Sequence, residues 1–218
     1  MKPGEKLLVD QWSQYQRPSG AEGRFVAEKM NKVHFELTSW GLKYVKIEPT
    51  FVILDVGCGG GRTLSRLARR ARLGKVYGID YSRDMAAYSM LTNCTLVTKD
   101  RISVVAASVS KTSFRAETFD LVTAVETYYF WPNLTESFKE IWRILKLNAR
   151  FLLINEMVKD GVFEVKNADT IQKTQVKLYS LKEIQAILWS CGFGNVEVFR
   201  KRKSYWNVIL AQKTNSGN

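Results

Sequence analysis

Three glycines at alternate positions, with an acidic residue before them, form the stretch with the clearest chemical meaning. Asp55 stands two residues before Gly57, and Gly59 and Gly61 follow. Glycine has no Cβ, so the backbone can turn sharply and come close to a ligand. A dinucleotide-binding fingerprint would place its third glycine at position 62, which is arginine here. The spacing therefore predicts a ligand-binding turn of a different kind.

The residues around the glycines predict the elements that would hold this turn. Residues 51 to 56 form a short apolar run interrupted only by Asp55, as in a strand covered on both faces. Leu64, Leu67, Ala68 and Ala71 then recur at helical spacing. A strand, a glycine turn and a helix in this order make the nucleotide-binding unit of open α/β sheets.

Further acids follow other predicted strands. Asp80 ends the predicted strand 75 to 80, about 20 residues beyond the glycine turn, where a carboxylate can accept both hydroxyls of a ribose. Glu126 ends the predicted strand 119 to 126. We expect it to belong to the site, because an unpaired buried carboxylate is costly. Asn155 and Glu156 occupy the analogous place after the predicted strand 151 to 154.

The rest of the chain predicts an alternation of helices and strands. An apolar stripe predicts one helix over residues 21 to 41, after an arm of residues 1 to 19 with one short helix. Residues 102 to 107 read as a strand, and 157 to 179 as an insertion. Ser180 and Glu183 form a capping box that opens a helix ending near Gly192. Residues 196 to 199 and 206 to 211 predict a terminal hairpin.

Length and composition indicate one globular α/β domain. The chain has 218 residues, 45% hydrophobic and 25% charged. No apolar run approaches a membrane span, and the first residues lack the apolar core of a signal peptide. Cys58, Cys94 and Cys191 are scattered and odd in number, which argues against a disulfide framework or a zinc site. We therefore expect a cytoplasmic protein without a metal, and the oligomeric state stays open.

The net charge of +12 is unusual and indicates attraction to anions. One basic cluster lies on and after the predicted first helix of the domain, and a second occupies residues 200 to 203. The first consists of Arg62, Arg66, Arg69, Arg70, Arg72 and Lys75. We interpret the basic clusters as solvent-exposed faces rather than a binding surface. The arginines recur on several sides of their helix without the interleaved aromatics of a nucleic-acid stacking platform. Contact with RNA or an anionic membrane is the alternative.

Three pieces in register resemble the class I S-adenosylmethionine (SAM)-dependent methyltransferases, most closely the small-molecule subgroup labelled methyltransferase type 11. They are residues 54 to 61, 78 to 82 and 119 to 122. The resemblance implies an α/β, Rossmann-like fold with a seven-stranded, mostly parallel sheet, helices on both faces and a C-terminal antiparallel hairpin. It divides the chain into an N-terminal helical arm or lid, residues 1 to 48, and a SAM-binding domain, residues 49 to 213.

The same resemblance implies which residues bind SAM, with S-adenosylhomocysteine as product. The backbone of the glycine turn would contact the methionine part, Asp55 its ammonium group and Asp80 the ribose. Tyr81 and Met85 would pack on the adenine, although Met85 also fits plain helix core. Ser108 replaces the family's usual acid near the adenine. The implied cofactor residues are Asp55, Gly57, Cys58, Gly59, Gly61, Asp80, Tyr81, Met85, Ser108, Val109 and Glu126.

Methyl transfer is an in-line displacement, so the enzyme mainly aligns the nucleophile and excludes water. A base is needed only where the nucleophile must lose a proton. His34, the only histidine, follows Met30 and Asn31 in a phrase shared with uncharacterised microbial family members. We predict His34 and Tyr129 as catalytic candidates across the pocket. A surface histidine bonded to a backbone carbonyl is the competing interpretation.

The sequence excludes some acceptors more firmly than it identifies one. Residues 126 to 131 read Glu-Thr-Tyr-Tyr-Phe-Trp and lack the Asp/Asn-Pro-Pro-aromatic motif of DNA amino-methyltransferases. No Pro-Cys pair supports cytosine C5 chemistry. We predict transfer to a small molecule. An RNA-directed methyltransferase or RNA-binding protein is the main alternative, and a SAM sensor without catalysis is a weaker one.

Overall fold

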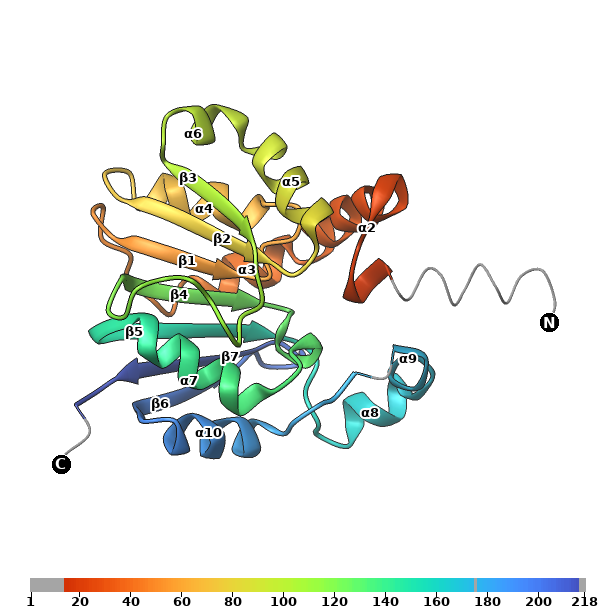
Figure 1. Cartoon of the computed structure of the whole chain (residues 1–218). Helices are drawn as coiled ribbons and strands as arrows, with labels where there is room; N and C mark the ends of the chain where they lie inside the picture. The colour runs from red at the N-terminus through yellow and green to blue at the C-terminus, as the bar shows by residue number, and fades with distance from the viewer. Residues whose placement is uncertain (1–13, 175, 216–218) are drawn as a thin grey trace.

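A single seven-stranded sheet organises the protein (Figure 1). The computed structural model describes residues 14–174 and 176–215. The strand order is β3-β2-β1-β4-β5-β7-β6, and β7 alone runs antiparallel to its neighbours. The strands are β1 Val52–Val56, β2 Lys75–Asp80, β3 Ile102–Ala106, β4 Phe119–Val125, β5 Leu145–Asn155, β6 Phe193–Arg200 and β7 Asn207–Lys213. This confirms the predicted Rossmann-like sheet with its C-terminal antiparallel hairpin.

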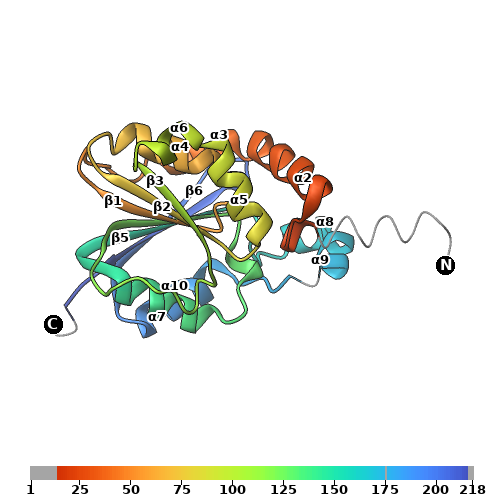
Figure 2. The same cartoon turned by 45° about the horizontal axis from the view of Figure 1, so that its top comes forward.

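Helices cover both faces of the sheet (Figure 2). One face carries α3, α4 and α5, and the opposite face carries α7 and α10. The helices are α2 Gly20–Val33, α3 Phe35–Gly41, α4 Arg62–Arg70, α5 Arg83–Thr92, α6 Cys94–Thr98, α7 Leu134–Ile144, α8 Val162–Lys166, α9 Ala168–Thr174 and α10 Leu181–Ser190, with a 3₁₀ turn η1 at Tyr128–Phe130. Each face has its own hydrophobic cluster, as in doubly wound sheets.

The predicted helix over residues 21 to 41 was wrong in its continuity, because it breaks at His34. The Thr38 hydroxyl donates to the His34 carbonyl at 2.7 Å, and such back-bonding bends helices. Beyond the break α3 buries Leu37, Thr38 and Gly41 against the sheet. Val33 belongs to the apolar stripe that predicted this helix, but it is 54% exposed. The break lets the two helices bury different faces.

Other differences concern element ends. β5 begins at Leu145 rather than at 151, and a register shift opposite β4 accommodates residues 146 to 149. Asn148 adopts φ 64° there, which asparagine tolerates better than most residues. The predicted insertion contains α8 and α9. Of the short helix predicted in residues 1 to 19, residues 14 to 16 are helical, and residues 1 to 13 lie outside the described part.

Side chains on α4 and α5 tie the N-terminal helices to the domain. Arg66 donates to the Phe35 carbonyl at 3.2 Å, and Arg70 donates to the Leu42 carbonyl at 2.9 Å. The Tyr88 hydroxyl donates to Glu28 at 2.7 Å. Two of the six cations in the first basic cluster therefore hold the arm.

Within the described residues, no helix is long and apolar enough to cross a bilayer.

Candidate active site

The carboxyl ends of the strands open into a cavity of about 760 Å³. Its wall includes the glycine turn after β1, Asp80 at the end of β2 and Glu126 after β4. The arm closes it on one side with Asn31 and His34. Ligands of open α/β sheets bind at this edge. The volume falls within the range of small-molecule sites.

The amides of the glycine turn are mostly used inside the protein. The N–H groups of Gly57 and Cys58 donate to the Ile79 carbonyl, that of Gly61 donates to the Cys58 carbonyl, and that of Gly59 donates to Asp80 Oδ2 at 2.8 Å. A phosphate cradle needs such donors free. The turn is therefore a poor phosphate site, which agrees with the absence of a dinucleotide-binding fingerprint in its sequence.

Gly57 and Gly59 require glycine for different reasons. Both have positive φ, at 70° and 49°. A Cβ on Gly57 would lie 2.5 Å from Thr127 Cγ2, whereas a Cβ on Gly59 would meet nothing within 4 Å. Gly57 lets the turn pack on the loop after β4, while Gly59 keeps the backbone bare beside the cavity. The Asn31 side chain lies directly over the next residue, Gly60.

Asp55 is buried at the end of β1. Its side chain accepts a hydrogen bond of 2.7 Å from the Thr123 hydroxyl, and the residue is 2% exposed. Burial raises the pKa of this carboxyl to about 7. Because it lines the cavity without a cationic partner among the described residues, it can receive a ligand cation.

Asp80 is fixed by two backbone amides. Oδ2 accepts from Gly59, and Oδ1 accepts from Ser82 at 2.9 Å. Burial raises the pKa of Asp80, and these two hydrogen bonds oppose the rise. The carboxylate therefore has a fixed orientation at the cavity wall while lone pairs remain for ligand hydroxyls.

The other predicted cofactor residues line the cavity with unequal exposure, except Gly61, which lies against Asn93 and Ser89 instead. Tyr81 is 64% exposed and carries Arg17 over its ring at 4.9 Å. Met85 and Val109 are buried, and Ser108 contacts Ser110 at 2.9 Å between hydroxyls. The Cys58 side chain belongs to the hydrophobic cluster under α4 and is buried.

Glu126 and Tyr129 form a hydrogen-bonded pair. Tyr129 donates from its hydroxyl to Glu126 Oε2 at 2.8 Å, and the Glu156 amide donates to Oε1. Glu126 is 7% exposed and adopts φ 55°. Burial, and then the Glu156 charge, raise its pKa to about 8. Burial also raises the pKa of Tyr129 well above its usual range, so the phenol acts as a hydrogen-bond donor.

His34 lines the cavity at the break between α2 and α3. Burial lowers its pKa to about 4, so the imidazole is neutral near pH 7. No hydrogen bond or ion pair joins the ring to any residue that the structure describes. The competing interpretation, a histidine bonded through its ring to a backbone carbonyl, is therefore not what the structure has.

Glu156 was not among the site residues predicted from the sequence, but it lines the cavity beside Glu126. Its neighbour Asn155 is different: the side chain is fully buried opposite Asn207, without hydrogen-bond partners for its amide atoms. Alternation along β5 separates the two, because successive side chains point to opposite sides of a strand. Met157 and Val176 also reach the wall, and only the fold could have placed them there.

Residues 54–153 match a family model described as Methyltransferase domain. Sterol 4-C-methyltransferase strm-1 of Caenorhabditis elegans is 25% identical over 152 residues, covering 70% of this chain and 43% of that protein. The 2-phytyl-1,4-naphtoquinone methyltransferase of Trichormus variabilis is 26% identical over 147 residues, covering 62% and 64%. The match spans less than two thirds of the length of either curated relative.

A solved structure extends the likeness beyond the matched residues. Phospholethanolamine N-methyltransferase 2 of Haemonchus contortus, in complex with phosphomonomethylethanolamine and S-adenosylhomocysteine, superposes with a TM-score of 0.73. Sequence identity is 17%, and the match covers 88% of this chain and 58% of that one. Residues 54–153 are therefore similar to a methyltransferase domain, and the sheet that contains them has the fold of the class I SAM-dependent methyltransferases.

Proposed function

We propose that the protein transfers the methyl group of SAM to a small-molecule acceptor. The observation that carries the proposal is one cavity that joins a glycine turn with few free amides to the carboxylates of Asp55 and Asp80. SAM has an ammonium and a ribose but no phosphate, so these groups match its needs. The domain match and the relatives named above support the same reaction.

The described residues fit this cofactor. Gly59 leaves space beside the backbone where a Cβ would stand. Asp55 is a buried carboxylate that lacks a cation among the described residues, which an ammonium would supply. Asp80, already oriented by two amides, would accept from the ribose hydroxyls. When bound, SAM would supply a sulfonium methyl carbon that a nucleophile attacks in line, with S-adenosylhomocysteine as the leaving group.

The remaining cavity wall would hold the acceptor. Asn31 and His34 close it from the arm, which would exclude water from the reacting atoms, and Glu126 and Tyr129 face it from the loop after β4. Tyr129 would orient Glu126 rather than remove a proton, because its hydroxyl is the donor of their hydrogen bond. His34 is the group with a free lone pair, and we assign it to the acceptor.

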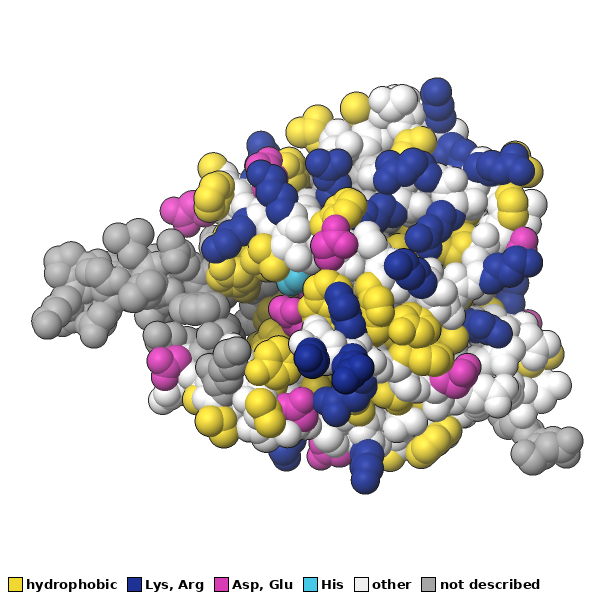
Figure 3. Space-filling model, turned by 180° about the vertical axis from the view of Figure 1, so that it is seen from behind, with side chains coloured by type: hydrophobic (Ala, Val, Ile, Leu, Met, Phe, Trp, Pro, Cys, Tyr) yellow, Lys and Arg dark blue, Asp and Glu magenta, His cyan; other side chains and the backbone are white. Residues whose placement is uncertain are grey.

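A small molecule suits this cavity better than RNA. The named relatives act on a sterol and on a phytyl naphthoquinone. Lysines and arginines on the face shown in Figure 3 are interspersed with other side chains, and Arg66 and Arg70 are engaged with backbone carbonyls.

We also infer a reducing, cytoplasmic location, which the free state of all three cysteines supports.

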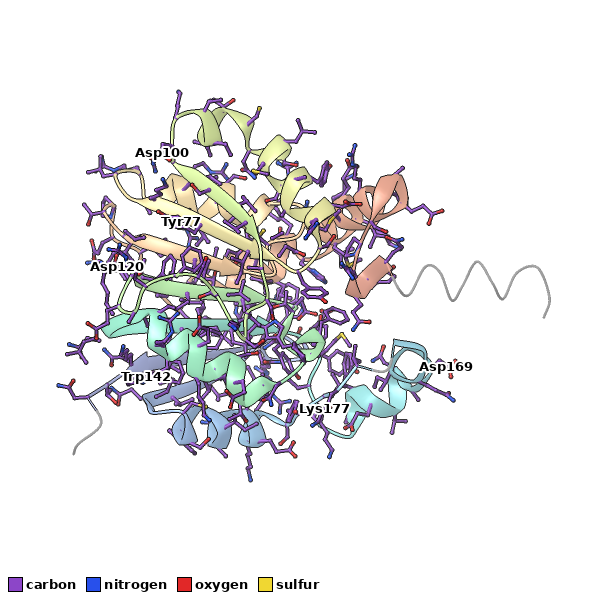
Figure 4. All side chains as sticks on the ribbon, in the orientation of Figure 1. Tyr77, Asp100, Asp120, Trp142, Asp169 and Lys177 are labelled. Carbon is purple, nitrogen blue, oxygen red and sulfur yellow. The ribbon has the colours of Figure 1, made fainter. Side chains whose placement is uncertain are left out.

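The cofactor assignment is tested by calorimetry with S-adenosylhomocysteine. Asp80→Ala should weaken binding more than tenfold, because it removes the ribose acceptor and the partner of the Gly59 amide. Asp100→Ala is the matched control. Asp100 lies just before β3, so it is at the amino ends of the parallel strands and away from the cavity (Figure 4). Wild-type affinity in Asp80→Ala would overturn the assignment.

The reaction itself is tested by screening metabolite extracts for S-adenosylhomocysteine production. Once an acceptor is known, His34→Gln should lower turnover by tenfold or more while leaving cofactor affinity unchanged. Unchanged turnover would make His34 part of the scaffold.

A further inference from the structure

Three potential metal ligands converge on the cavity wall from distant parts of the chain. His34 lies between α2 and α3, Glu126 follows β4 and Glu156 follows β5. One ligand atom of each lies within 4.8 Å of the other two. The three side chains are brought together only by the sheet order and by the arm that folds over it.

The two carboxylates lack a protein cation. The seven ion pairs among the described residues involve neither Glu126 nor Glu156. Glu126 is 7% exposed and Glu156 is half-buried, and adjacent carboxylates so shielded from water repel each other at considerable cost. Tyr129 and the Glu156 amide each donate to one oxygen of Glu126, but neither supplies a positive charge. A cation from outside the chain would complete the cluster.

The histidine indicates which kind of cation. An organic ammonium would be held by carboxylates and aromatic faces and would gain nothing from a neutral imidazole nitrogen. A transition metal uses that lone pair together with carboxylate oxygens, whereas Mg²⁺ prefers oxygen ligands alone. The His34 ring has no hydrogen bond to any residue in the described ranges, so its lone pair is available.

The surroundings of Glu126 resemble those of a metal ligand. Ligating carboxylates are oriented by hydrogen bonds of their own, as Tyr129 and the Glu156 amide orient Glu126. Its φ of 55° is rare for a residue with a side chain and indicates a conformation that the fold imposes. Both features hold one carboxylate in place.

We propose that His34, Glu126 and Glu156 bind one divalent transition-metal ion, with its remaining positions open to oxygen atoms of the methyl acceptor. This role rests on the proposed function and specifies what His34 does there. Ligand atoms around such an ion lie about 3 Å apart, so binding requires the side chains to approach by about 1 to 2 Å. The ion would neutralise the carboxylates and orient an acceptor hydroxyl.

The test is a titration of the chelator-treated, full-length protein with Co²⁺ and Zn²⁺. Wild type should bind one equivalent by calorimetry, with a visible Co²⁺ absorption that indicates protein ligands. His34→Gln and Glu156→Gln should each weaken binding at least tenfold to a hundredfold, the loss that follows from removing even an outer-shell partner of a ligand. Glu197→Gln, an exposed site on the edge strand β6, is the matched control and should bind as wild type does.

S-adenosylhomocysteine affinity is measured on the same samples, so failure of the cofactor assignment is seen separately and each variant's fold is checked. No saturable metal binding by a wild type that binds S-adenosylhomocysteine would overturn the proposal and leave a cationic acceptor as the partner of the carboxylates. Metal binding that survives both His34→Gln and Glu156→Gln would overturn it as well.

Discussion

Asp55→Asn should stabilise the ligand-free protein relative to wild type, and this difference in the free energy of unfolding should grow as pH rises. Burial raises the pKa of Asp55 from 3.8 to about 7. At low pH the carboxyl is protonated in both the folded and the unfolded states. Between the two pKa values only the unfolded chain ionises, so rising pH favours unfolding, and above about pH 7 the full penalty is present. Asparagine carries no such penalty and can accept the same hydrogen bond from Thr123.

The magnitude follows from about 1.4 kcal/mol per pKa unit, which gives a total penalty of about 4 kcal/mol. Between about pH 5 and pH 8, linkage gives a change of about 2 to 3 kcal/mol. Urea unfolding at both pH values gives the free energy of unfolding of variant and wild type. The difference between the two proteins should be larger at the higher pH by this amount. The exposed Asp169→Asn on α9 is the control and should show no such change.

A difference between variant and wild type that stays flat with pH would refute this reasoning, because it would mean that the native carboxyl ionises as freely as the unfolded one. The same variant tests the ligand side. If Asp55 receives the SAM ammonium, Asp55→Asn should weaken SAM binding at least tenfold even where it stabilises the fold, since a charge-assisted hydrogen bond is lost.

Three further outcomes are expected. Gly57→Ala should lower the free energy of unfolding by about 2 to 4 kcal/mol, because its Cβ meets Thr127 at 2.5 Å and φ is 70°. Gly59→Ala should lower it by only about 1 kcal/mol, yet weaken S-adenosylhomocysteine binding at least tenfold. Urea unfolding and calorimetry check both variants, and equal destabilisation would contradict the assignment. Tyr128→Phe should lose about 1 to 2 kcal/mol in urea unfolding, because the buried hydroxyl donates to the Met157 carbonyl at 2.8 Å, and an unchanged midpoint would show that water replaces this bond. Filter binding should detect only weak RNA association that salt abolishes, and tight, sequence-specific binding at micromolar protein would disprove the small-molecule reading of the charge.

Much of the fold was predictable because local patterns and sheet position agree. The apolar run before Gly57, the carboxylate at Asp80 and the capping box at Ser180 each have a local physical cause, and each lies where it was expected. The seven-stranded sheet and its antiparallel hairpin came from the family resemblance, but the order of the strands was not predicted, since periodicity gives strands but not their neighbours.

The rest depended on contacts between distant residues. Nothing local signals the break at His34, because the apolar stripe continues through it, and only packing of α3 on the sheet requires a bend. The pairing of Glu126 with Tyr129 is local, but the approach of Glu156 follows from β5 lying beside β4. The apolar run 151 to 154 likewise gave no sign that β5 begins six residues earlier, since only pairing with β4 extends it.

The position of β7 between β5 and β6 affects how the chain is made. Synthesis runs from the N-terminus, so β5 and then β6 emerge before the strand that separates them in the sheet. Until β7 follows, the apolar edge of β5 has no partner on that side, and such an edge can recruit strands from other nascent chains. Conditions that slow translation through residues 193–213 should therefore lower the yield of native protein through aggregation, although the native fold is unaltered.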